Sequence, residues 1–387
     1  MFIKDVNNEN IVWVVLALHA VFNNSTIDTE TRIELKQLVN EGTKQNVFQP
    51  TEVTSLTVPM FLLYSLTFDG PLEIIFSQYI VMRDCGIAKE DIISAIDGVV
   101  TRRITSNELE VRNAVLHTIL SLRDKAPVVV YSSILELLQI LFSKLSNEED
   151  NTTELFGQFL SELLTNISNL SDNQSDILAI CTMIQNVQIT KPRLFTQYGT
   201  ELLFPLCYKI NSMAINDTSL NDQLFIASSK IISNILNFHR TKLSNRYHLI
   251  NTFLCECLSL FSNQNTNKFS SSSAMALGRL IVNFCEPTIS STSSSKNEKQ
   301  LSSNTGIIKK NVRRYAPALL IKYVHICITS NIGDDVRKEL TPAMYAILDL
   351  VSQNELNQVG KILDNSGRQY FKVLYAEYKR LGKWHER

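Results

Sequence analysis

Apolar residues recur at helical spacing along almost the whole chain, and this periodicity limits the fold more than any other feature of the sequence. In ELFGQFLSELLTNISNL, residues 154–170, they form one wide stripe, the spacing of a helix packed on one face. Glycine and proline, which interrupt helices, number only 12 and 9 in 387 residues. The β-branched run VVVY at residues 128–131 is too short to indicate a strand and leads into a helical pattern. The sequence therefore predicts an all-α fold.

Polar segments rich in Asn, Ser, Asp and Thr separate the expected helices. SDNQSD near residue 173, NDTSLND near 219 and SNQNTNKFSSSS near 266 follow one another about 46 residues apart. Helix pairs of HEAT and armadillo proteins repeat every roughly 40 to 47 residues. We therefore expect an irregular HEAT/armadillo-like stack of antiparallel helix pairs, an α-solenoid, although no consensus motif repeats along it.

A Ser-rich segment with almost no apolar residues, ISSTSSSKNEKQLSSNTG, divides the chain. We expect a helical-repeat array over residues 1–288, a disordered linker over 289–306 and a C-terminal helical cap over 307–387. Residues 306–387 carry 14 Lys and Arg against 8 Asp and Glu, a net charge of +6, whereas the preceding residues carry −7. An acidic body with a basic C-terminal part indicates a polyanionic or acidic partner for that part.

Capping signals mark the helices expected in this cap. Thr341 before Pro342 predicts a helix start with proline in the first turn, and Ser352 with Glu355 has the spacing of a capping box. Ser366 is the expected cap of the last helix.

The last helix combines aromatic and basic residues in the run FKVLYAEYKRLGKW. Its apolar positions share one face and predict core packing: Phe371, Leu374, Tyr375, Tyr378 and Leu381. Gly382 is expected to end the helix. Trp384 lies beyond this glycine, so it either packs back onto the helix as a hydrophobic lock or anchors a partner.

Two groups of basic residues in the C-terminal part predict an RNA or partner surface: Lys309, Lys310, Arg313, Arg314, Lys372, Lys379, Arg380 and Lys383. The first four also resemble a weak nuclear-targeting cluster. A solvated helix face is the alternative interpretation of the same charges.

No catalytic or cofactor-binding motif is present in the sequence. GxGxxG, GxxxxGK[ST], HExxH and GxSxG are absent, and the histidines lie singly, so we expect no cofactor, no metal site and no enzyme. The longest apolar run, residues 11–22, is shorter than a bilayer requires, and we expect no membrane segment. The cysteines, scattered over apolar segments and odd in number, are typical of a reducing compartment and of small buried side chains: Cys85, Cys181, Cys207, Cys255, Cys257, Cys285 and Cys327.

The C-terminal residues resemble a known family. The segment LD..GR at Leu363 to Arg368 and FK.LY.EYK..GKW at Phe371 to Trp384 are similar to the ending of nucleolar pre-ribosome assembly factors of the Urb/Npa type, the unhealthy ribosome biogenesis protein two family. The resemblance implies an α-helical scaffold in early large-subunit assembly, in a nucleolar complex with a second large helical-repeat protein and an RNA helicase. Members of that family are longer than 387 residues, so a C-terminal portion or a truncated relative is expected.

Three hypotheses follow for the function. The first is a non-catalytic helical scaffold in nucleolar assembly of the large ribosomal subunit and pre-rRNA processing, with pre-rRNA contact through the basic C-terminal part. The alternatives are a HEAT-like nuclear transport or cytosolic adaptor protein, and a helical enzyme without a recognisable motif.

Overall fold

The computed structural model describes most of the chain from residue 128 onward. The described ranges are 128–144, 150–170, 174–213, 218–243, 245–262, 268–286, 298–330 and 332–382, with residues 96–101 and scattered positions between 33 and 118. Every regular element in these ranges is a helix and none is a strand, which confirms the all-α prediction. Val128, in the β-branched run, begins a helix.

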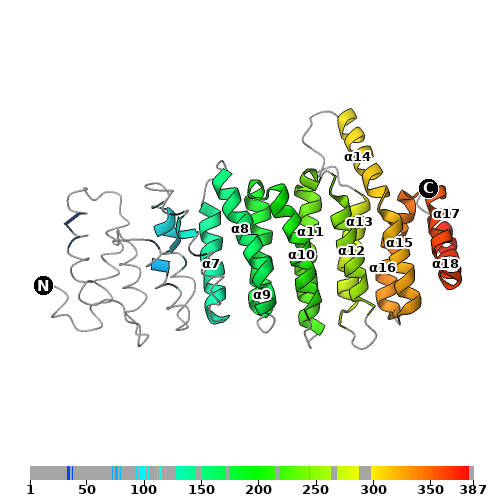
Figure 1. Ribbon diagram of the computed structural model, residues 1–387, viewed down its shortest axis with the longest axis horizontal. Coiled ribbons are helices and arrows are strands. Elements are labelled where there is room, and N and C mark those ends of the chain that lie inside the picture. Colours follow the sequence, from blue (N-terminus) through cyan, green and yellow to red (C-terminus); the bar gives the residue numbers. More distant parts are fainter. Residues whose placement is uncertain are drawn as a thin grey trace. The chain divides into compact units, whose positions relative to one another are not determined.

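The helices carry the labels of Figure 1. Their bounds are α7 Val128–Lys144, α8 Asp150–Asn166, α9 Gln174–Thr190, α10 Gln197–Ser212, α11 Thr218–Phe238, α12 Tyr247–Leu260, α13 Ser271–Cys285, α14 Glu298–Arg313, α15 Ala316–Thr329, α16 Asp334–Leu350, α17 Gln353–Ile362 and α18 Asn365–Gly382. Short 3-10 turns are η1 Ile167–Leu170, η2 Pro192–Leu194 and η3 Arg240–Leu243.

The chain divides into two compact units, Met1–Leu155 and Phe156–Arg387. In the first unit, the hydroxyl of Tyr79 donates to Glu136 of α7 at 2.5 Å, and Lys144 pairs with Asp97 at 3.1 Å. The second unit contains the expected C-terminal cap together with the part of the array that precedes it from Phe156 onward.

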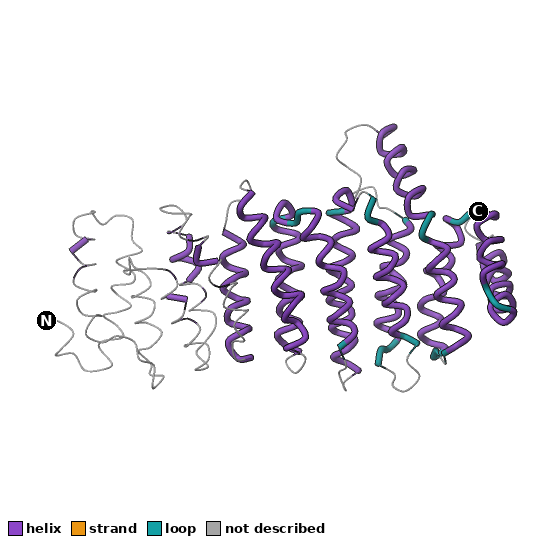
Figure 2. Tube along the Cα trace, in the orientation of Figure 1, coloured by secondary structure: helices purple, strands orange, loops and turns teal. Residues whose placement is uncertain are grey.

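The second unit is a two-layered stack of antiparallel helix pairs (Figures 1 and 2). Helices α9, α11, α13 and α16 pack side by side in one layer, and α10, α12 and α15, followed by α17 and α18, form the other. The layers meet where α10 contacts α11, α12 contacts α13 and α15 contacts α16. This arrangement confirms the predicted stack of helix pairs.

Side-chain amides join neighbouring helices of the first layer at the expected repeat spacing. Asn234 of α11 donates to Gln188 of α9 at 3.1 Å, and Asn283 of α13 donates to Asn237 of α11 at 3.0 Å. Both pairs are separated by 46 residues. The helical pairs therefore repeat structurally even though no consensus sequence repeats.

Basic side chains cap helix ends across the stack. Lys209 of α10 donates to the carbonyl of Leu164 in α8 at 2.8 Å, and the buried Arg240 donates to the carbonyl of Asn283 in α13 at 2.6 Å. The last carbonyls of a helix lack partners within the helix and carry its negative dipole end, so a cation stabilises them. Part of the basic content is thus used inside the fold.

Two helix starts differ from the sequence expectation. Helix α16 begins at Asp334, and Pro342 lies inside it, because the acidic first turn and the apolar stripe already specify a helix there. The backbone N–H of Gly367 donates to Asp364 at 2.7 Å, so Asp364, rather than Ser366, caps α18. The capping box of Ser352 and Glu355 at the start of α17 is confirmed.

The second half of the Ser-rich segment is helical. Residues 298–306, expected to belong to a disordered linker, form the first turns of α14. Leu301, Ile308 and Val312 lie at helical spacing and Val312 is fully buried, which explains why a helix forms there. Residues 289–297 lie outside the described residues. Helix α14 projects from the stack and contacts α13 and α15 (Figure 1).

Candidate nucleic-acid interface

The aromatic face of α18 anchors this helix to its neighbours. Phe371 and Leu374 are buried, and the ring of Tyr370 lies 6.4 Å from that of Tyr323 in α15. Core packing is therefore confirmed for Phe371 and Leu374. Leu381, placed on the same face by the sequence, is 46% exposed.

The tyrosines of α18 stack on one another. Ring centroids of Phe371 and Tyr375 lie 6.2 Å apart and those of Tyr375 and Tyr378 6.0 Å apart. Tyr375 donates its hydroxyl hydrogen to Gln353 at 3.2 Å, and Tyr378 donates to Asp349 at the end of α16. Because these rings and hydroxyls already have partners, their arrangement favours a structural role over open stacking platforms for bases.

Exposed basic side chains lie beside this aromatic stack. Lys372 and Lys379 are seven positions apart, about two helical turns, and share one side of α18, roughly 10 Å apart along its axis. The ammonium of Lys379 lies 4.7 Å from the centre of the Tyr375 ring. Arg380 is also exposed but points about 100° further round the helix. Lys372 and Lys379 therefore form the basic edge of α18.

The other basic group lies at the end of α14. Lys309, Lys310 and Arg314 are exposed, whereas Arg313 forms an ion pair with Glu355, with Nε 2.7 Å from the carboxylate. Burial raises the pKa of Glu355, but hydrogen bonds from Ser352 and Arg313 outweigh it and lower this pKa overall. Arg313 therefore fixes α14 to the start of α17, which the sequence could not show.

The first turn of α17 brings the two basic groups to the same end of the stack. Glu355 in this turn holds Arg313 of α14, and Gln353 in the same turn accepts the hydrogen bond from Tyr375 of α18. Of the eight predicted residues, six are exposed, and five of these lie at the end of α14 or on the basic edge of α18: Lys309, Lys310, Arg314, Lys372 and Lys379. Arg313 is paired, Arg380 points elsewhere on α18, and Lys383 lies outside the described residues, as does Trp384.

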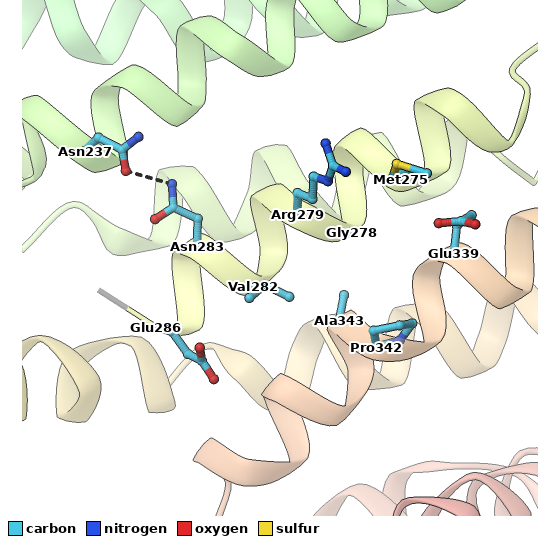
Figure 3. Close-up of a pocket in the computed structure, with 10 residues that line it drawn as sticks. All are labelled: Asn237, Met275, Gly278, Arg279, Val282, Asn283, Glu286, Glu339, Pro342 and Ala343. Carbon is cyan, nitrogen blue, oxygen red and sulfur yellow. Dashed lines mark hydrogen bonds between the residues drawn. The ribbon is translucent and has the colours of Figure 1, made fainter. Parts of the chain in front are cut away.

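A groove that the sequence analysis missed runs along α13 between α11 and α16 (Figure 3). Its volume is about 610 Å³, and Met275, Val282, Pro342 and Ala343 contribute apolar surface. The sequence pattern predicts a helix start at Pro342, whereas this proline lies inside α16 and lines the groove. The only sequence signal for this site was the repeat spacing of Asn237 and Asn283, which lie at its edge.

The described residues offer no group of three or more side chains arranged to hold a metal ion. Burial raises the pKa of the Cys181 thiol to about 12 and that of Cys255 to about 11, so both are protonated at neutral pH. Cys181, Cys207, Cys257 and Cys285 are buried, as expected for small apolar side chains. Among the described helices, none combines the length and the apolarity that crossing a bilayer demands.

A stack of helix pairs with one basic end and an open groove defines a helical-repeat protein whose surfaces suit binding. The model of the Urb2/Npa2 family matches residues 178–387, from α9 to the end of the chain, and the chain belongs to this family. Membership confirms the resemblance seen in the terminal residues and implies a role in ribosome biogenesis. No curated protein and no solved structure matches the chain.

Proposed function

We propose that this chain is a non-catalytic helical scaffold in nucleolar assembly of the large ribosomal subunit and in pre-rRNA processing. The observation that carries the proposal is the family match over the stack and its basic end. A stack of helix pairs presents long surfaces without needing a reaction centre, which suits a protein that holds other molecules together. The proposed partners are a second large helical-repeat protein and an RNA helicase.

We further propose that pre-rRNA contacts the basic end of the stack. Lys309, Lys310 and Arg314 at the end of α14, and Lys372 and Lys379 on α18, offer exposed cations to phosphates. Since the adjacent tyrosines are engaged, the contact is to the RNA backbone and carries little sequence preference.

Charge reversal of these five residues tests the RNA contact. Replacing Lys309, Lys310, Arg314, Lys372 and Lys379 with Glu should weaken binding to pre-rRNA fragments and reduce its salt dependence by about 0.7 to 0.9 in slope for each lost phosphate contact. Arg313 is left unchanged because its ion pair supports α17. The thermal melt should move little, since exposed charges contribute little to folding.

A control variant separates position from net charge. Arg193→Glu with Lys230→Glu reverses two exposed cations elsewhere in the same unit and should leave RNA binding almost unchanged. The matched test variant is Lys372→Glu with Lys379→Glu, which alters the net charge by the same amount and should weaken RNA binding. Equal loss in the test and control variants would reject the basic end as the site.

The location of a tagged protein tests the scaffold function. A tagged protein that stains the cytosol or the nuclear rim and does not sediment with pre-ribosomes would favour a transport or adaptor protein.

A further inference from the structure

The groove along α13 owes its shape to a close helix contact and an internal proline. A Cβ atom at Gly278 would lie 2.9 Å from the backbone oxygen of Glu339, so only glycine lets α13 and α16 approach this closely. Pro342 lies inside α16 and has no backbone N–H, so its ring adds apolar surface to the groove where the helix lacks one hydrogen bond. The groove therefore lies beside a close contact between α13 and α16, and Pro342 forms part of its apolar wall.

Two carboxylates mark different levels of this groove. Glu339 on α16 lies beside Gly278, and Glu286 follows the last turn of α13 (Figure 3). Neither forms an ion pair with another residue that the structure describes. Arg279, the cation of the lining, points away from α16 in Figure 3. The side of the groove next to α16 is therefore acidic.

The surface around the groove differs from the basic end of the stack. On α9 none of the exposed side chains is charged; Lys230 is the charged one among the exposed side chains described on α11, and Arg279 among those on α13. A polyanion finds few cations here and meets the carboxylates of Glu286 and Glu339. Apolar surface with side-chain amides and carboxylates instead suits a basic polypeptide.

The spacing of the carboxylates sets the length of the segment that fits. Glu286 follows Gly278 by eight positions, about 12 Å along a helix. An extended chain advances roughly 3.3 Å for each residue, so about four residues cover this length. Asn237, whose oxygen accepts from Asn283, keeps its NH₂ group as a donor at the groove edge.

We propose that the groove between α11, α13 and α16 binds an extended basic segment of a partner protein, in which an apolar residue lies between two Lys or Arg residues about four positions apart. The apolar side chain fills the space lined by Val282, Pro342 and Ala343, and the basic side chains pair with Glu286 and Glu339. The groove is lined from α11, α13 and α16, whereas the residues proposed to contact RNA lie at the end of α14 and on α18, so a scaffold would hold protein and RNA with different residues.

Fluorescence anisotropy with a labelled peptide centred on Lys-Ser-Leu-Ser-Lys tests the proposal. The intact chain should bind this peptide, and Glu286→Lys with Glu339→Lys should weaken binding by roughly tenfold. The same double variant should gain affinity for the peptide that carries Glu in place of both Lys residues. Val282→Arg fills the apolar space of the groove and should weaken binding of the Lys peptide to the otherwise intact chain. Added to the double variant, it should weaken binding of the Glu peptide as well.

Matched controls make the result specific to the groove. Glu256→Lys changes an exposed carboxylate on α12 and should leave peptide binding unchanged, and thermal melts should show that all variants are folded. No binding to the intact chain, equal binding of peptides with Lys and with Glu, or an unaltered affinity in the double variant would overturn the proposal. Binding of polyuridylate RNA should not change with Val282→Arg; a loss would assign the groove to RNA and also overturn it.

Discussion

His239 is a buried titratable residue directly after α11. Its side chain is only 1% exposed, and its ring lies 5.2 Å from that of Phe195. Burial lowers its pKa from 6.5 to about 4, and the positive charge of Lys242 acts in the same direction. The neutral imidazole is therefore the form that the folded stack accepts.

We predict that His239 makes the second unit less stable in acid. The unfolded chain takes up this proton near pH 6.5 and the folded chain only near pH 4, so stability falls as the pH drops through that interval. The loss approaches about 3 kcal/mol when the pH falls below both values. Urea unfolding of the wild type and of His239→Gln at pH 7 and pH 4.5 measures it.

The comparison between the two proteins isolates this residue. Other groups also titrate in acid, including Glu355, whose pKa is lowered in the fold. His239→Gln should therefore retain part of the acid sensitivity but lose the share that His239 contributes. An identical pH dependence in both proteins would show that the folded chain binds this proton as readily as the unfolded chain.

Helices α13 and α16 illustrate how one backbone position controls the contact between two elements. We predict that Gly278→Ala destabilises the protein by about 1 to 3 kcal/mol, because the new methyl group presses on the backbone oxygen of Glu339. Gly360→Ala in α17 is the matched control, since nothing lies within 4 Å of its added Cβ. The control should raise stability by about 0.5 to 1 kcal/mol. Chemical denaturation distinguishes the opposite signs.

Trp384 follows α18 and remains a sequence-based prediction. We expect it to pack back onto the helix, so Trp384→Ala should cost about 3 to 5 kcal/mol in the free energy of unfolding. Leu381→Ala, at a position that is 46% exposed, should cost much less. Unchanged stability of Trp384→Ala combined with lost pre-ribosome association would instead identify a partner anchor.

Local patterns predicted the helices well, whereas contacts between distant residues could not be derived from them. Helical periodicity and the capping box of Ser352 depend on neighbours in sequence, so they were readable directly. Pro342 was wrong as a helix start because proline on an exposed helix face resembles proline in a first turn. The pairing of Arg313 with Glu355 joins residues 42 positions apart and depends on how α14 packs.

At the scale of the whole molecule, the second unit should fold without the first. We predict that a fragment covering residues 150–387, which keeps α8 intact, is helical by circular dichroism and unfolds cooperatively in urea, because its core lies within its own helix pairs. A fragment ending at residue 350 lacks α17 and α18, which cover α15, and should be less stable or aggregate. If the fragment covering residues 150–387 unfolds without a cooperative transition, this prediction is wrong.

The side-chain hydrogen bonds from Asn234 to Gln188 and from Asn283 to Asn237 each join one helix of the first layer to the next. In a rod built from such nearest-neighbour joints, bending is shared as a small rotation at every joint. Pulling on the two ends of this unit would stretch it as a spring, and the unit would recoil without the loss of a helix. Such elasticity would let the protein stay bound to two molecules while the distance between them changes.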